Sequence, residues 1–511
     1  MTLRTNLISN YASQIYTTLI AIVVLPFYMN ALGPEAYGLI AFYMMLQAWF
    51  NLLDLGLTPT ISRETARYFC GALALRDYKN LTRALLAFFL MVSFLGGFFL
   101  YLSSDFLVHR WLKIELLGNE LASNTVKLMA IIVSLRWLGG LFRGVIVGAE
   151  KLVYLSACVI FFTSFRFLGV FLSMYAWGYT IDVFFIHQLL SAILELLTLI
   201  GVCYKVIPDR YYQEKVNSFS IKPIKSTVRF SLSVAFTAAI WVVVTQTDKL
   251  ILSGILSLDA YGYYSLAVII ASSVMIISGP ISNVIMPRLT KLYVENDEVG
   301  FTSVYRSFTQ FICVVAGSIS AMLVYYSEPI IYTWTSDGAL SKVISPIVMP
   351  YAIGNLFLSV SAFVYYYQYA KGQLRLHVVG NALFAMLLIP MSVIGAKLYG
   401  GLGAGYAWLF ANSLYLVIWV SYVHTRLGFS LAIRWFLVDV TFIICPIFFF
   451  VSLLPSLKVS NYTSIELAVT LAFIYLCVLA FSSTMSSGFR KVLIRKVSSV
   501  APFKVVRCGK K

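Results

Sequence analysis

Long apolar stretches recur along nearly the whole chain, and no other feature of the sequence constrains its fold as strongly. A helix that crosses the hydrocarbon core of a bilayer needs about 20 such residues. Hydrophobic residues make up 60% of the chain and charged residues only 12%, whereas a soluble domain carries about 25% charged residues. The sequence therefore predicts an all-α polytopic membrane protein with about 14 transmembrane helices. The stretches cover residues 8–30, 38–57, 84–107, 126–147, 153–175, 182–204, 231–255, 261–286, 308–331, 346–370, 376–398, 404–424, 435–457 and 464–484.

The residues that catalysis and metal binding require are scattered along the chain. The seven cysteines form no Cys-x-x-Cys pair and mostly fall inside apolar stretches, as buried thiols do. His109, His187, His377 and His424 are similarly separated. The sequence contains no phosphate-binding loop, serine-hydrolase or zinc-protease signature. We therefore predict no catalytic residue, no metal site and no cofactor.

Lysine and arginine residues gather on one side of the predicted spans. With a cytoplasmic N-terminus, the inner connections and the C-terminal tail hold 28 of them, and the outer loops hold 4. Positive residues favour the cytoplasmic side of a membrane, so we expect both termini there. The same distribution accounts for the net charge of +17, because basic connections face anionic lipid headgroups. No nucleic-acid partner is implied.

An internal repeat indicates that the chain is built from two similar halves. Residues 32–38 read Leu-Gly-Pro-Glu-Ala-Tyr-Gly and residues 256–262 read Leu-Ser-Leu-Asp-Ala-Tyr-Gly, at an offset of 224. Gly148 and Gly372, both in short inner turns, are related by the same offset. Parallel repeats of this kind are typical of transporters, whose substrate site lies between the repeats.

We therefore expect two parallel six-helix lobes related by pseudo-two-fold symmetry, followed by two additional helices. The predicted divisions are an N-terminal lobe at 1–205, a basic cytoplasmic linker at 206–230, a C-terminal lobe at 231–424, two additional helices at 435–484 and a basic cytoplasmic tail at 485–511.

Three motifs in the first part of the chain are specific: Leu32-Gly-Pro-Glu-Ala-Tyr-Gly-Leu-Ile-Ala-Phe, Leu53-Asp-Leu-Gly-Leu and Ser62-Arg-Glu-Thr-Ala-Arg67. They resemble the Wzx-type polysaccharide flippases of the multidrug/oligosaccharidyl-lipid/polysaccharide exporter superfamily. Residues 143–151, 246–252, 261–267 and 286–290 add to the likeness, which covers roughly residues 1–425.

The resemblance implies a flippase of the bacterial inner membrane that works by alternating access. Its cargo would be undecaprenyl-diphosphate-linked oligosaccharide repeat units, such as O-antigen units, carried from the cytoplasmic to the periplasmic leaflet. Membrane lipids, a glycan polymerase and a chain-length regulator are the further partners to expect.

Charged residues within the spans are the candidate functional residues, because an ionised side chain in a bilayer usually faces a cavity or a partner. Arg136 and Arg166 lie at similar depth on the fourth and fifth spans, and Arg143 lies two helical turns from Arg136. Arginine binds phosphate through a rigid bidentate fork. We predict that Arg136, Arg143, Arg166 and Lys249 bind the substrate. Alternatively, Arg143 snorkels to the membrane interface and the other arginines form structural ion pairs with Glu195 or Asp182.

The acidic residues of the spans have several interpretations. Asp248 and Glu195 are candidates for binding H⁺ or Na⁺ in ion-coupled transport, with inter-helix salt bridges as the alternative. Asp54 is expected to be structural, and Glu35 and Asp259, beside outer turns, are expected to cap helices. A tyrosine-rich run at 365–369 suits either sugar stacking or an interfacial aromatic belt.

Two alternative functions remain open at this point. An ion-coupled multidrug exporter of the same superfamily would share the architecture, although a cavity lined by arginines repels cationic drugs. An integral-membrane glycan polymerase or ligase would need a larger outer loop than the roughly fifteen residues of the longest one, at 109–123.

Overall fold

A computed structural model describes residues 3–207, 222–427 and 432–486. Within these ranges every regular element is a helix, and 12 segments are long and apolar enough to cross a membrane. The prediction of an all-α polytopic membrane protein is therefore confirmed. Much of the predicted linker at 206–230 and nearly all of the tail at 485–511 lie outside the described residues.

The number of membrane crossings depends on how two long helical segments are counted. One segment, Arg375–Arg426, counts as a single candidate span although it has 52 residues. A straight helix of that length would measure about 78 Å, far more than the ~30 Å of a hydrocarbon core. Helix α11, Lys222–Ile255, has 34 residues and is not among the 12 candidates. The predicted count of fourteen stays a prediction.

The 52-residue segment is a helical hairpin. Helix α16, Arg375–Leu414, departs from helical backbone at Tyr399 and at Gly400, where φ is +60°. On either side of this turn, Gly395 and Gly403 bring two backbones together, since a Cβ on Gly403 would lie only 2.0 Å from the Gly395 carbonyl oxygen. Further along the two arms, the rings of Phe384 and Tyr415 lie 5.4 Å apart.

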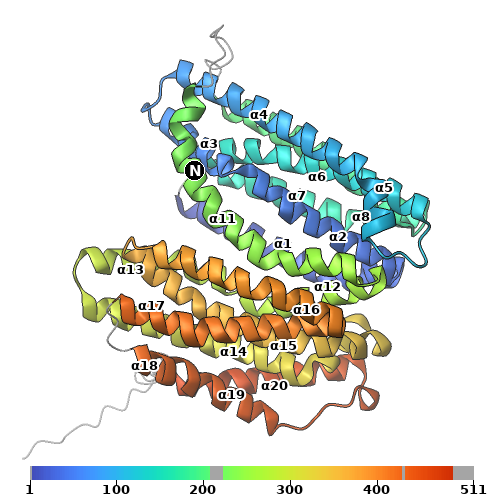
Figure 1. The fold of residues 1–511 in the computed structure, drawn as a ribbon, viewed down its shortest axis with the longest axis vertical. Helices are drawn as coiled ribbons and strands as arrows, with labels where there is room; N and C mark the ends of the chain where they lie inside the picture. Colours follow the sequence, from blue (N-terminus) through green and yellow to red (C-terminus); the bar gives the residue numbers. More distant parts are fainter. Residues whose placement is uncertain (1–2, 208–221, 428–431, 487–511) are drawn as a thin grey trace, which may run out of the picture. The chain divides into compact units, whose positions relative to one another are not determined.

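The chain divides into two compact units, residues 1–266 and 267–511. These units are not the lobes predicted from the repeat, at 1–205 and 231–424. The predicted lobe boundaries stay a prediction. Helices of the first unit are α1 Leu3–Leu32, α2 Pro34–Phe50, α3 Leu57–Phe69, α4 Leu75–Leu102, α5 Ser104–Phe106, α6 Asn119–Gly148, α7 Leu152–Phe167, α8 Gly169–Trp177, α9 Ile181–Val206 and α11, with the first part of α12 Leu258–Ser272 (Figure 1).

The second unit holds the long helices α14 and α15, with the last two spans packed against α14. Its helices are α13 Ser278–Val294, α14 Glu298–Thr335, α15 Gly338–Ala370, α16, α17 Ser421–Arg426, α18 Ala432–Arg434, α19 Phe442–Ser452 and α20 Ser464–Met485 (Figure 1). Two wider helical turns, η4 Tyr415–Val420 and η5 Trp435–Thr441, precede α17 and α19.

A sharp break after α2 creates a helix that the apolar pattern did not predict. Leu55 and Gly56 adopt left-handed backbone with φ of 46° and 70°. The Asp54 carboxylate then accepts hydrogen bonds from the Thr58 amide at 3.1 Å and the Thr58 hydroxyl at 2.5 Å, so the structural role expected for Asp54 agrees with its contacts. The following helix, α3, carries basic residues and packs against α6.

Apolar packing between α3, α4, α6 and α9 fixes the position of α6 in the first unit. Phe89 of α4 stacks on Trp137 of α6 with ring centroids 4.6 Å apart. Leu141 and Leu199 are buried in the same cluster. Burying each such side chain contributes about 1.5–3 kcal/mol relative to exposure in water, although in a bilayer packing and shape complementarity replace part of this contribution. The polar residues of α6 therefore sit on a rigid helix.

Candidate cationic substrate site

Arg136 and Arg166 meet where α6, α7 and α9 pack together. Gln188 of α9, only 2% exposed, joins them. Its side-chain oxygen accepts a hydrogen bond from Arg136 Nη2 at 2.9 Å. Its side-chain nitrogen donates to the main-chain carbonyl oxygen of Arg166 at 3.1 Å. One amide side chain thus sets the position of one guanidinium and of the backbone that carries the other.

The junction of α7 and α8 explains why the backbone at Arg166 accepts side-chain donors. α7 ends at Phe167, and carbonyl groups at the end of a helix lack their usual partners within the helix. The Phe165 carbonyl oxygen lies 2.9 Å from His187 Nε2. The Arg166 carbonyl oxygen accepts from Gln188 Nε2 at 3.1 Å, and the Phe167 carbonyl oxygen accepts from the Tyr28 hydroxyl at 2.7 Å. The break that places Arg166 is therefore stabilised by α1 and α9.

Glu195 of α9 brings a negative charge to this region. It forms an ion pair with Arg143 Nη2, and it interacts electrostatically with Arg136 and Arg166 as well. Arg166 in turn experiences the charges of both other arginines. The structure thus brings the three predicted arginines into one electrostatic group, which we call the arginine cluster. This differs from the structural alternative, in which Arg143 snorkels and the other arginines pair with Glu195 or Asp182. Here Arg143 forms the ion pair with Glu195, whereas Arg136 bonds to Gln188.

The arginine cluster leaves hydrogen-bond donors unused. The Nε atoms of Arg136 and Arg166 are both buried without a hydrogen-bond partner. A buried donor without a partner costs about 1–3 kcal/mol, and more when the group is charged. Aromatic faces flank both cations: the Arg136 guanidinium carbon lies 6.0 Å from the Tyr43 ring centroid, and that of Arg166 lies 4.5 Å from the Phe167 ring centroid. This arrangement suits an anionic ligand with several acceptor oxygens.

Lys249 and Asp248, the remaining predicted site residues, have partners of their own on α11 and α12. Lys249 Nζ donates to Gln246 Oε1 at 3.2 Å within α11. Asp248, which is 4% exposed, accepts a hydrogen bond from the Tyr264 hydroxyl of α12 at 2.7 Å. The Asp248 contact holds α11 against α12. A role for either residue in substrate binding or ion coupling stays a prediction.

The expectation that Glu35 caps a helix is wrong. Its carboxylate accepts hydrogen bonds from the backbone amides of Glu115, Leu116 and Leu117, in the connection between η2 Leu107–Trp111 and α6. Gly33 occupies the N-cap position of α2, with no side-chain cap. The Asp259 carboxylate accepts from the Ser257 hydroxyl at 2.5 Å.

Sequence reasoning missed Gln188, Tyr43 and Gln47. Gln47 Nε2 donates to the Tyr43 hydroxyl at 2.6 Å, which orients the ring beside Arg136. A glutamine within an apolar stretch is the signal that could have pointed to this region, because an amide in a membrane span needs a partner. Which partner it has could not be read from spacing alone.

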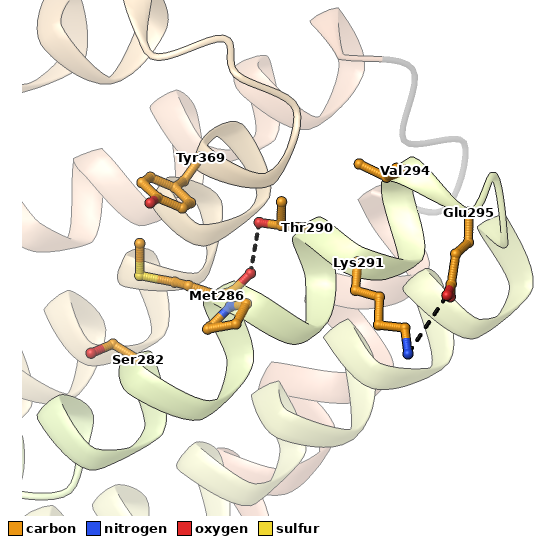
Figure 2. Close-up of a pocket in the computed structure, with 8 residues that line it drawn as sticks. Ser282, Met286, Thr290, Lys291, Val294, Glu295 and Tyr369 are labelled. Atoms are coloured by element: carbon orange, nitrogen blue, oxygen red, sulfur yellow. Dashed lines mark hydrogen bonds and ion pairs between the residues drawn. The ribbon is translucent and has the colours of Figure 1, made fainter. Parts of the chain in front are cut away.

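A shallow cavity of about 680 Å³ lies in the second unit along one face of α13. Figure 2 shows Tyr369 of α15 closing one side of it and the ion pair between Lys291 and Glu295, 3.6 Å long, at the far end. Its lining is mainly apolar, with Met286 and Val294 among the residues. The tyrosine-rich run at 365–369 thus contributes Tyr369 to an apolar hollow, and sugar stacking there stays a prediction.

Comparison with known proteins identifies the family. A family model described as "Polysaccharide biosynthesis protein" matches residues 3–293. The chain belongs to this family. Among curated relatives of the family, a "Putative O-antigen transporter" of Shigella flexneri is 26% identical over 303 residues, which is 57% of this chain and 68% of the relative. The resemblance seen in the motifs is therefore confirmed.

Two solved structures have a fold similar to that of this chain. "Lipid II flippase MurJ, inward closed conformation" aligns with a TM-score of 0.69 at 14% identity, covering 97% of this chain and 99% of that one. An inward-facing multidrug resistance MATE family transporter of the MOP superfamily aligns with a TM-score of 0.64 at 11% identity, covering 81% and 94%. Family and fold are those of a multi-pass membrane transporter rather than an enzyme, so the polymerase or ligase alternative is dropped.

Proposed function

We propose that this protein is a flippase for undecaprenyl-diphosphate-linked oligosaccharide repeat units of the O-antigen type. It would carry them from the cytoplasmic to the periplasmic leaflet of the bacterial inner membrane by alternating access of two lobes. The polysaccharide family, the O-antigen transporter relative and the flippase fold support a lipid-linked cargo.

The arginine cluster carries the proposal. Arg136, Arg143 and Arg166 contribute three positive charges, and Glu195 contributes a negative charge that interacts with all three. A diphosphate diester carries about two negative charges and many acceptor oxygens, which matches both the excess charge and the unused Nε donors of Arg136 and Arg166. The polyprenyl tail would remain in lipid while the headgroup passes this point.

The same cluster argues against the multidrug alternative. Cationic drugs would meet two guanidinium groups with unsatisfied donors in a region of low dielectric, where like charges repel strongly. The fold alone is shared with multidrug exporters, and a fold does not fix the cargo.

Coupling, orientation and partners complete the proposal. Glu195 and Asp248 are the residues at which H⁺ or Na⁺ would couple to transport. Both termini would face the cytoplasm, because the basic residues gather on that side. A glycan polymerase and a chain-length regulator would receive the translocated units.

The direct test is reconstitution of the purified protein in proteoliposomes. Polyprenyl-diphosphate-linked oligosaccharide is placed in both leaflets, and an impermeant glycosidase outside reports the fraction that becomes accessible. We expect nearly complete cleavage with the protein and about half without it. The matched lipid with a monophosphate in place of the diphosphate should be translocated poorly. Equal translocation of both lipids would contradict a diphosphate site.

A further inference from the structure

The first turns of α2 and α12 cross each other through residues related by the repeat. A Cβ on Gly38 would lie 2.1 Å from the Leu258 carbonyl oxygen, and a Cβ on Gly262 would lie 2.6 Å from the Pro34 carbonyl oxygen. Gly38 and Gly262 are 224 positions apart, and so are Pro34 and Leu258. Reciprocal contacts of this kind are those of a two-fold interface. Both glycines are required because the backbones touch.

The connection between η2 and α6, which the topology prediction places on the outer side, is held to α2 by Glu35. The two oxygens of the Glu35 carboxylate accept from the amides of Glu115 at 2.6 Å, Leu116 at 2.9 Å and Leu117 at 2.7 Å. Glu35 is only 5% exposed. Three successive amides around one carboxylate form an anion-binding nest. A buried carboxylate would lose this stabilisation if the connection moved away.

The same connection is bonded to the turn between α11 and α12. Lys113 pairs with Ser257 as an isolated β-bridge, its carbonyl oxygen accepts from the Leu258 amide at 2.9 Å, and its Nζ donates to the Ile255 carbonyl oxygen at 2.6 Å. Trp111 Nε1 donates to the Ser253 hydroxyl at 3.0 Å. Residues 111–117 therefore bind α2 on one side and the α11–α12 turn on the other.

We propose that residues 111–117, Glu35 and the α11–α12 turn form a releasable outer clasp that keeps the periplasmic side closed. The clasp joins the first hairpins of the two predicted repeats, so outward opening requires its bonds to break. The side chains of Lys113 and Trp111 are the parts that release from α11, while Glu35 keeps the connection on α2. This inference rests on the proposed alternating access, but not on the identity of the cargo.

A disulfide across the clasp tests the inference. Lys113→Cys and Ser257→Cys are combined in a cysteine-free, transport-competent background, and surface-glycan display is followed in a strain lacking the native gene. We expect oxidation to form the disulfide and to reduce translocation at least tenfold, with recovery on reduction in the same sample. Unchanged translocation in the oxidised protein would overturn the clasp, as would failure of the pair to cross-link.

Asp105→Cys with Ser123→Cys is the matched control pair. These residues are hydrogen-bonded to each other on α5 and α6, at the same end of the first unit but within one predicted lobe. Their disulfide should form without slowing transport. If cross-linked 113–257 protein transports normally while Arg136 variants do not, the clasp fails and the proposed function stands.

Accessibility gives a second readout that needs no transport. Ser265→Cys lies one turn below Tyr261 on α12 and replaces a residue that is 5% exposed. An impermeant thiol reagent added outside should label it several-fold faster when Glu35→Gln is also present, because a neutral amide fills the nest less well. Equal labelling rates in folded protein with and without the Glu35→Gln substitution would contradict a closing role for Glu35.

Discussion

Arg306 holds Asp439 through two parallel hydrogen bonds, Nε to Oδ2 at 2.5 Å and Nη2 to Oδ1 at 3.0 Å. Asp439 is fully buried and also accepts from Gln310 Nε2 at 2.6 Å. The Ser486 hydroxyl donates to Gln310 Oε1 at 3.0 Å. One carboxylate thus connects α14 to η5, and through Gln310 to the end of α20. The last two spans are bound to the second unit by this network.

Asp439→Ala should therefore destabilise the protein strongly. It removes the buried acceptor that Arg306 and Gln310 share, and breaking a buried pair from one side costs about 3–5 kcal/mol. We expect a lower thermal transition in detergent, read by fluorescence of the purified protein. Glu328→Ala, on the same helix α14, is the comparison. If Asp439→Ala melts at the wild-type temperature, the network does not hold the last spans.

Arg136→Ala and Arg166→Ala should each impair surface-glycan display at normal protein level. Losing a charge-assisted hydrogen bond costs about 1.5–3 kcal/mol, a roughly tenfold to hundredfold effect on binding. Arg136→Lys should fall between, because a lysine keeps the charge and loses the fork. Lys127→Ala on the same helix, which pairs with Asp105 at 3.8 Å, should transport normally. Normal display by both alanine variants would rule the phosphate site out.

Substitutions of Gln188 test how the position of Arg136 matters, because they leave the three guanidinium groups of the arginine cluster in place. Gln188→Glu should bind Arg136 more tightly and compete with the cargo, so translocation should fall while folded protein stays abundant. Gln188→Met removes the hydrogen bonds to Arg136 and to the Arg166 carbonyl oxygen and leaves the guanidinium charges in place. We therefore expect a smaller loss of about threefold to tenfold, in line with a net contribution of about 0.5–1.5 kcal/mol for a hydrogen bond. Both are measured in proteoliposomes at equal protein. Faster transport by the glutamate variant would contradict the anion site.

The ion pair between Arg143 and Glu195 allows a purely structural role of these two residues to be tested directly. If it is only structural, Arg143→Met should lower the amount of folded protein, and adding Glu195→Met should restore both folding and translocation. If Glu195 balances the arginine cluster, the double variant should fold but translocate less than wild type. Protein in the membrane fraction is quantified beside glycan display. Full recovery of both in the double variant would remove Arg143 and Glu195 from the transport site.

Orientation is tested by labelling single cysteines placed at Glu115 and Ser498 in a cysteine-free background. An impermeant reagent should reach position 115 only from the periplasm and position 498 only from the cytoplasm. The reason is the concentration of basic residues on the predicted inner side. Labelling of both positions from one side would show that the number of crossings between them is even.

The apolar stretches predicted the long helices, but they did not predict the polar residues at the ends of these helices. The stretch at 126–147 became α6, Asn119–Gly148, because Asn119 and Glu120 continue the helix beyond the apolar band. The apolar pattern did not predict helix α3, because this helix is short and polar on one face. Residues far apart in sequence were harder still: the partner of Glu35 is a set of backbone amides 80 residues away, and side-chain patterns carry no signal for such donors.

For the candidate site, depth along the helices brought Arg136 and Arg166 together correctly, because helical rise converts residue spacing into distance. The break after Phe167, which presents three carbonyl groups to α1 and α9, could not be read from the sequence. Its cause is tertiary, since Tyr28, His187 and Gln188 supply the donors. The substrate-binding role of the arginines awaits the measurements above.

The tight reversal of α16 has a practical consequence for handling this protein. Gly395 and Gly403 are in backbone contact. An epitope or fluorescent reporter inserted at Tyr399–Gly400 would therefore separate the two arms of the hairpin and disrupt their packing. The connection between α19 and α20 offers the better place, because Lys458, Ser460 and Asn461 are exposed and lie outside both of these helices. A tag placed there would report surface delivery while leaving the folded spans intact.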